Sequence, residues 1–97
     1  MNRQELEKLT GKILEEKLGC DVSVHVCLID HKIRFEYGRS GSGRIHDIEM
    51  WLPVYLQQAP QEVAENIIDC IAVKIKKGKK PEYSAAAKAW IDANRSG

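Results

Sequence analysis

The sequence lacks the features that define several large classes of protein. Its 15 basic and 14 acidic side chains leave a net charge of +1, so no overall positive field attracts nucleic acid or an anionic membrane. Its apolar runs are much shorter than the roughly 20 residues that a membrane-spanning helix requires. Three cysteines, an odd number, provide no disulfide framework, and free thiols are typical of a reducing compartment. We therefore expect a cytoplasmic protein that neither crosses a membrane nor has nucleic acid as its main partner.

What the sequence does contain is the composition of an ordinary globular protein. Hydrophobic residues make up 43% of the chain and charged residues 30%, which is typical of a soluble domain. A length of 97 residues is sufficient for one hydrophobic core and too short for two, so we expect a single domain over residues 1–97. The charged, amphipathic N-terminal segment is unlike a secretory signal, and we expect none.

Helix signals bound the N-terminal segment. Asn2 and Glu5 have the spacing of a capping box, in which each side chain bonds the backbone N–H of the other residue. The apolar residues that follow recur every three or four positions, which predicts one buried helix face. Gly19 stands where a glycine commonly ends a helix. The predicted helix spans residues 3–18.

Three segments after this helix alternate between apolar and polar residues, as half-buried strands do. They cover residues 21–29, 33–37 and 45–50. Asp30 and His31 are the expected tip of a hairpin between the first two strands, and the glycine-rich segment 38–44 is the expected turn before the third. The third strand has two faces of mixed character, which favours a position at the edge of the sheet.

The rest of the chain is predicted to be helical. Pro53 and Pro60 enclose a short helical turn, and an apolar stripe then predicts a helix that Gly78 ends. Pro81 opens a last helix. We place its buried stripe at Ala85, Ala86, Ala89, Trp90 and Ala93. The order predicts an α+β fold with an N-terminal helix, a three-stranded antiparallel sheet and two C-terminal helices, with helices covering one face.

Several short motifs between residues 39 and 90 occur in the order found in a family of small zinc peptidases. They are a glycine-rich turn before a strand, a Leu-Pro pair after the strand, an Ala-Pro-x-Glu-Val helix start, and an aromatic-Ser pair beyond that helix. Their positions are Gly41, Gly43, Leu52, Pro53, Ala59, Pro60, Glu62, Val63, Tyr83 and Ser84. With these motifs and its order of elements, the chain resembles the minigluzincins and, more distantly, the SprT-like domains. The resemblance implies a minimal zincin-like fold.

In that family, the helix that follows the Glu-Val pair carries His-Glu-x-x-His. The two histidines bind zinc, and the glutamate activates the metal-bound water. The matching positions here are Cys70, Ile71 and Lys74. An isoleucine takes up no proton, and a lysine repels a metal ion. The resemblance therefore implies the scaffold without its catalytic residues, and we expect no peptidase activity, no cofactor and no bound metal.

The function predicted from these observations is a non-catalytic, peptidase-like domain whose partner is a protein or a peptide. In active members of the family, an edge strand beside the active-site helix pairs with extended substrate. The counterpart here is the third strand, which would accept a partner strand by β-augmentation. The predicted contact residues are Arg44, His46, Ile48 and Met50. The same edge would also permit assembly into a homo-oligomer.

Two alternatives stay open at the level of the sequence. A lysine cluster at the end of the second long helix would bind an anion or nucleic acid, although lysines there also complement the helix dipole. It consists of Lys74, Lys76, Lys77, Lys79 and Lys80. A metal-dependent enzyme with atypical ligands would use Cys70, or His25 with Cys27 and His46. We interpret Trp51 and Trp90 as anchors of the core.

Overall fold

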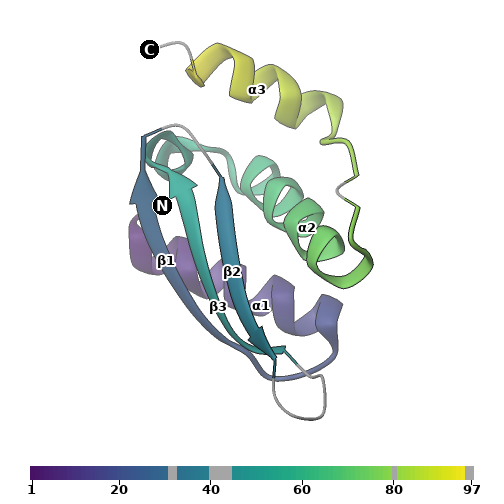
Figure 1. The fold of residues 1–97 in the computed structure, drawn as a ribbon. Coiled ribbons are helices and arrows are strands. Elements are labelled where there is room, and N and C mark those ends of the chain that lie inside the picture. The colour runs from purple at the N-terminus through teal and green to yellow at the C-terminus, as the bar shows by residue number, and fades with distance from the viewer. Residues whose placement is uncertain (31–32, 40–44, 80, 96–97) are drawn as a thin grey trace.

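A computed structural model describes residues 1–30, 33–39, 45–79 and 81–95 of the chain. The elements, in chain order, are α1 (Arg3–Leu18), β1 (Ser23–Ile29), β2 (Arg34–Arg39), β3 (Ile45–Pro53), the 3-10 helix η1 (Val54–Gln58), α2 (Gln61–Lys77) and α3 (Ala85–Arg95). Figure 1 shows the three strands side by side, with α3 beyond one end of them. The predicted α+β class is confirmed. Among the described residues, no helix is long and apolar enough to cross a membrane.

The sheet is mixed rather than antiparallel, because β3 lies between β1 and β2. β3 runs parallel to β1, with Met50 opposite Val26, and antiparallel to β2, with Met50 opposite Phe35. The predicted hairpin between the first two strands is therefore wrong, since β1 and β2 are not neighbours, and His31 lies outside the described residues. Alternation in the sequence indicates which residues share a face, but it does not say which strands pair.

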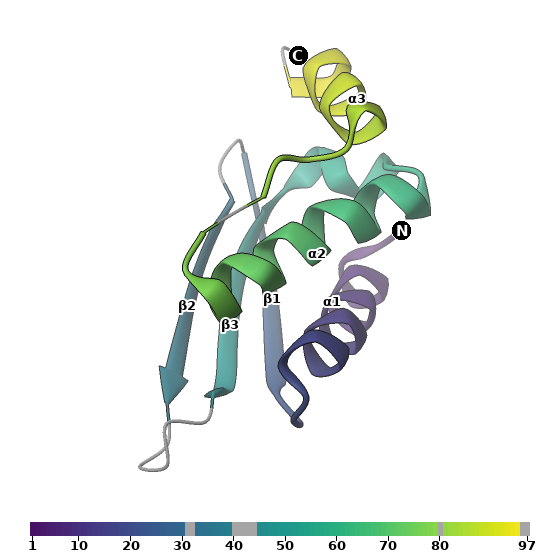
Figure 2. The same cartoon turned by 90° about the vertical axis from the view of Figure 1, so that its right-hand side faces the viewer.

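The core lies between the sheet and two helices on one of its faces. Figure 2 shows α1 and α2 on the same side of the strands, so the opposite face carries no helix of the described chain. Met50 and Leu52 of β3 are 0% exposed, and so are Leu6 of α1 and Ile67 of α2. These side chains belong to one apolar cluster. A central strand is covered by both neighbours, so the strand with the most apolar inner face gains most by lying there.

The predicted bounds of α1 and the predicted end of α2 are confirmed by their caps, whereas α3 begins at Ala85 and not at Pro81. The Glu5 N–H donates to the Asn2 side chain at 2.8 Å, and the Asn2 N–H donates to the Glu5 carboxylate at 3.1 Å, which completes the capping box. Gly19 ends α1 with a φ of 71°, and Gly78 ends α2 with a φ of 82°. Glycine enters this left-handed region without the strain that a side chain would cause.

Of the predicted stripe of the last helix, only Trp90 packs inward, and Ala87 joins it. Ala87 is fully buried, and the Trp90 ring lies against Tyr55 of η1 with ring centroids 5.7 Å apart. The Ala87 N–H donates to the Ser84 hydroxyl at 3.2 Å, which caps the start of α3. The other predicted positions are exposed: Ala85, Ala86, Ala89 and Ala93. Turning the large Trp90 ring inward removes more apolar surface from water than turning alanines inward would.

Candidate functional site

The third strand is not an edge of the sheet. β3 pairs with β1 on one side and with β2 on the other, so its backbone is engaged on both sides. His46 is exposed, but Ile48 and Met50 are buried on the helix side. Arg44 lies outside the described residues. The predicted peptide-binding edge at β3 is therefore wrong, and the two edges of the sheet are β1 and β2.

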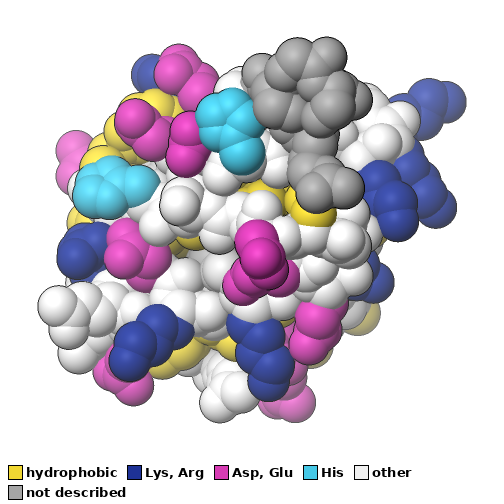
Figure 3. Space-filling model, turned by 90° about the horizontal axis from the view of Figure 1, so that it is seen from below, with side chains coloured by type: hydrophobic (Ala, Val, Ile, Leu, Met, Phe, Trp, Pro, Cys, Tyr) yellow, Lys and Arg dark blue, Asp and Glu magenta, His cyan; other side chains and the backbone are white. Residues whose placement is uncertain are grey.

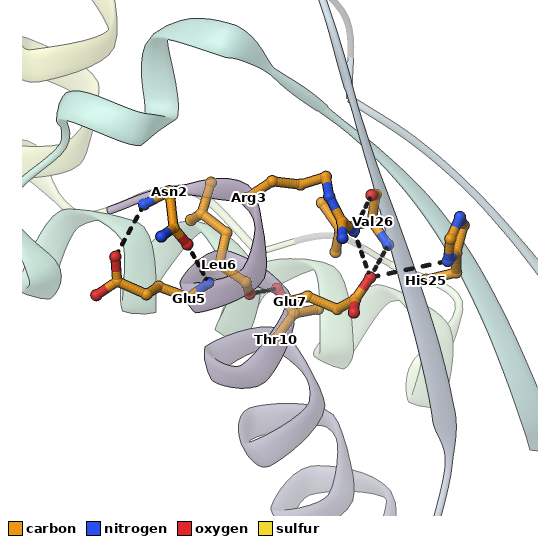
Figure 4. Close-up of polar contacts among 8 residues, drawn as sticks. All are labelled: Asn2, Arg3, Glu5, Leu6, Glu7, Thr10, His25 and Val26. Carbon is orange, nitrogen blue, oxygen red and sulfur yellow. Dashed lines mark hydrogen bonds and ion pairs between the residues drawn. The ribbon is translucent and has the colours of Figure 1, made fainter.

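The edge of β1 is covered by two polar side chains of α1. Glu7 Oε2 accepts the Val26 N–H at 2.9 Å, and Arg3 Nη1 donates to the Val26 carbonyl oxygen at 3.1 Å. Arg3 and Glu7 also bond each other at 2.9 Å, as Figure 4 shows. The pair thus supplies the acceptor and the donor that a neighbouring strand would otherwise offer to Val26.

These contacts favour the ionised form of Glu7. The Val26 N–H lowers the pKa of the Glu7 carboxyl below its ordinary value of 4.5, partial burial opposes this effect, and the Arg3 guanidinium lowers the pKa further. His25 Nδ1 lies 3.8 Å from the same carboxylate oxygen. An ionised carboxylate is a stronger hydrogen-bond acceptor than a neutral one, so the hydrogen bond from the Val26 N–H to Glu7 is strong at neutral pH.

No such cover lies over the edge of β2 among the described residues. The Val26 N–H points away from β3, toward Glu7. In a parallel pair, the residue opposite such an outward-facing residue directs its own N–H and C=O toward the neighbouring strand, so the backbone groups of Met50 face β1. Phe35 lies opposite Met50, so its own N–H and C=O point away from β3. The backbone of Phe35 therefore faces the outer side of β2, where a further strand would pair.

Two aromatic rings lie beside this edge on the helix side of the sheet. Phe35 and Tyr37 have centroids 6.3 Å apart and planes 16° apart, which is a stacked arrangement. Tyr37 is 40% exposed, which is high for a large apolar side chain in this chain. Rigid aromatic side chains at a surface provide a large contact area at little conformational cost.

The opposite face of β2 is charged. The Arg34 guanidinium lies over the Trp51 ring, 4.7 Å from its centroid. Trp51 thus lies on the face opposite α1 and α2 and is not the core anchor that we predicted, because its strand alternation opposes that of the buried Met50. Glu36 lies directly opposite Glu49 of β3. Like charges in that position repel, so a cation placed next to Glu36 would be favoured.

The histidines and cysteines of the described chain do not converge on a metal site. His25 and Cys27 occupy alternate positions of β1, and His46 bonds the Asp47 carboxylate at 2.7 Å. Figure 3 shows two separate histidine side chains, each with acidic side chains nearby. No group of three His, Cys, Asp or Glu side chains in the described ranges could hold a metal ion. The metal-dependent alternative therefore gains no site from these residues.

Two of the three positions that match the zinc motif are buried. Cys70 is 4% exposed, and its Sγ lies 3.8 Å from the carbonyl oxygen of Glu82, in the segment that leads into α3. Ile71 is 1% exposed and belongs to the core. Lys74 is exposed, and its Nζ donates to the Gly78 carbonyl at 2.9 Å. Cys70 and Ile71 are thus packed inside the protein and do not face solvent.

The lysine cluster lies where two helices end. Lys74 bonds the carbonyl that follows α2, and Lys76 Nζ donates to the Lys17 carbonyl near the end of α1 at 3.1 Å. Cations at helix C-termini stabilise the unpaired carbonyl groups there. The other members differ in status: Lys77 and Lys79 are exposed, and Lys80 lies outside the described residues. These contacts favour a structural role for Lys74 and Lys76 over anion binding.

Sequence reasoning missed the contrast between the two edges. The spacing of Arg3 and Glu7 is that of a helix ion pair, but nothing in it predicts that the pair meets Val26. The alternation of Arg34, Phe35 and Glu36 predicts a strand, but it does not indicate that this strand lies at the edge of the sheet.

No family model matches the chain, no curated protein is detectably similar to it, and no solved structure matches it. The resemblance to the minigluzincins therefore rests on the short motifs and on the order of the elements.

Proposed function

We propose that this chain is a non-catalytic interaction module that binds an extended protein segment by adding it as a strand to β2. The contrast between the two sheet edges carries this proposal. Arg3 and Glu7 close β1 by bonding Val26, whereas Phe35 directs its backbone groups to the outer side of β2. Proteins commonly block the strand edges that must not pair, so β2, whose edge no described residue blocks in this way, is a candidate for pairing.

The side chains of β2 suit a bound strand. Backbone hydrogen bonds supply affinity in such complexes, and alternate side chains supply specificity. On the helix side, the stacked rings of Phe35 and Tyr37 offer an apolar surface. On the outer face, Arg34 and Glu36 are 62% and 70% exposed and offer one charge of each sign. A partner segment with alternating apolar and charged residues would complement both faces.

The non-catalytic part of the proposal is supported by the positions that match the zinc motif. Cys70 lies beneath the segment before α3, and Ile71 is in the core, so neither meets a substrate in this arrangement. The zincin-like origin of the scaffold is itself part of the proposal. It is supported by the strand that leads into η1 and α2, and by the terminal helix that follows.

Selection of octapeptides from a random library tests the proposal directly. Residue-level amide exchange should be fast for Phe35 in the free protein and slower when a selected peptide is bound. The Glu36 amide should be slow in both states, because its backbone groups face β3. Selected peptides that protect another surface and leave Phe35 unchanged would contradict the proposal.

Two substitutions at one position separate backbone pairing from side-chain contact. Phe35→Pro and Phe35→Ala both remove the ring, but only proline also removes the outward N–H. Proline is tolerated where a strand N–H points away from the sheet. We expect Phe35→Ala to weaken peptide binding and Phe35→Pro to abolish it, with both variants folded by circular dichroism. Equal binding by the two variants would argue against strand addition at this edge.

A further inference from the structure

We infer that the strand which β2 accepts is β2 of a second copy of this chain, in an antiparallel pair centred on Phe35. This inference rests on the proposed binding edge and names its partner. The two sheets would join into one continuous sheet across a two-fold axis at Phe35. The helices of both copies would then lie on the same face, because the axis is perpendicular to the sheet.

The segment Arg34-Phe35-Glu36 is complementary to itself in this register. Antiparallel alignment with Phe35 opposite Phe35 places Arg34 of each copy opposite Glu36 of the other. The two-fold axis creates this pair of opposite charges twice. On the helix side, Ile33 of each copy lies opposite Tyr37 of the other, which pairs an apolar side chain with an exposed ring.

Neighbouring registers lack this complementarity. Hydrogen bonding requires that residues whose backbone groups face outward lie opposite one another, so the two-fold axis must pass through a residue and not between two residues. An alignment centred on Arg34 places two guanidinium groups opposite each other. One centred on Glu36 places two carboxylates opposite each other. Like charges directly opposite across strands are destabilising, so the sequence of β2 selects the centre at Phe35.

Other charges on the sheet face opposite α1 and α2 also favour the register centred on Phe35. Glu36 already lies opposite Glu49 on its inner side, and its intrachain partner Arg34 is 3.6 Å away. Arg34 from the second copy would place a further cation on the outer side of Glu36. The interface is a single strand pair with its flanking side chains, so we expect a weak and reversible dimer, with a dissociation constant roughly in the micromolar range.

Charge exchange at the edge tests the register. Sedimentation velocity over a range of concentrations at low salt should report a dimer for the unmodified protein. Arg34→Glu and Glu36→Arg should each raise the dissociation constant about tenfold, because two attractive pairs become repulsive. The combined variant restores both pairs with reversed signs, and its dissociation constant should return close to the original value. Such recovery requires Arg34 and Glu36 to face each other across the axis.

Glu49→Arg is the matched control for Glu36→Arg. It makes the same change of charge on the same face, but one strand further from the axis, and it relieves the same repulsion between Glu36 and Glu49. We expect it to leave the dissociation constant within about twofold of the original, so a loss confined to Glu36→Arg reports the interface rather than the fold. In the unmodified protein, amide exchange at Phe35 should also slow as concentration rises, a readout that needs no substitution.

The outcomes separate this inference from the proposed function. A monomer at all concentrations overturns the dimer, and peptides that protect Phe35 would then still support strand addition with a different protein as partner. A dimer that is indifferent to both charge reversals and leaves Phe35 exchange unchanged places the contact elsewhere and overturns the register. A monomer that binds no extended peptide at β2 overturns both.

Discussion

Replacing Glu7 by alanine should open the edge of β1 and destabilise the fold. The substitution removes the acceptor that lies 2.9 Å from the Val26 N–H, and it removes the partner of Arg3. A hydrogen bond to a charged group contributes about 1.5–3 kcal/mol, and a partly exposed ion pair contributes at most about 1 kcal/mol. Water reaches this edge, and alanine favours the helix slightly more than glutamate, so we expect a loss of about 2 kcal/mol in the free energy of unfolding.

Urea unfolding followed by circular dichroism measures this loss, and the midpoint of thermal unfolding should fall by about 10 °C. Glu7→Gln retains an oxygen that can accept the Val26 N–H, so it should lose about half as much stability. Glu15→Ala makes the same chemical change at an exposed position of the same helix, and it should alter stability by less than about 0.5 kcal/mol. If Glu7→Ala cost no more than Glu15→Ala, the reasoning about the covered edge would be refuted. A second consequence is increased self-association of Glu7→Ala, because β1 then presents a backbone without its cover.

Three further predictions concern pH, the zinc-motif positions and the last helix. The lowered pKa of Glu7 stabilises the fold at neutral pH. This contribution to the free energy of unfolding should decrease as the pH falls below 4.5 toward the pKa of the folded state. Urea unfolding of Glu7→Gln should show a weaker dependence on pH in that window. The combined change Cys70→His, Ile71→Glu and Lys74→His should abolish cooperative unfolding rather than create a zinc site, because it buries a carboxylate in the core. Zinc titration with a circular dichroism readout checks this. A folded variant that binds zinc would contradict it. Trp90→Ala should lower the free energy of unfolding by about 1–2 kcal/mol and accelerate amide exchange chiefly in α3, because the ring is only partly buried; uniform acceleration over the whole chain would show that α3 is not a separate unit of stability.

The local elements of this fold could be predicted from the sequence because their causes are local. Asn2 with Glu5, and the glycines at 19 and 78, act on backbone groups within one helical turn, and the structure places the helix ends at these caps. The alternation of strand residues similarly separates inner from outer side chains. In α3 the predicted stripe was right at Trp90 and wrong at its alanines, because the face that turns inward depends on contacts between segments far apart in the chain, such as that of Trp90 with Tyr55.

The candidate site could not be predicted, because it depends on the order of the strands. The sequence suggested β3 as an edge from its mixed faces, yet the buried side chains of that strand place it at the centre. Because β3 lies between the other strands, β1 and β2 are the edges. Only with this strand order can the contact of Glu7 with Val26 be recognised as the cover of a sheet edge.

By itself, the sequence determined the α+β class, the helix caps and the inward faces of the first two strands, since these follow from dihedral preferences and hydrophobic periodicity within a few residues. It also carries the self-complementary order Arg34-Phe35-Glu36. Only the tertiary structure decided that β2 is an outer strand, that α1 covers the opposite edge, and that Trp51 lies on the face opposite α1 and α2. The physical reason is that strand pairing is a competition among whole segments for burial and backbone hydrogen bonds, and its outcome depends on contacts between residues that are distant in the chain.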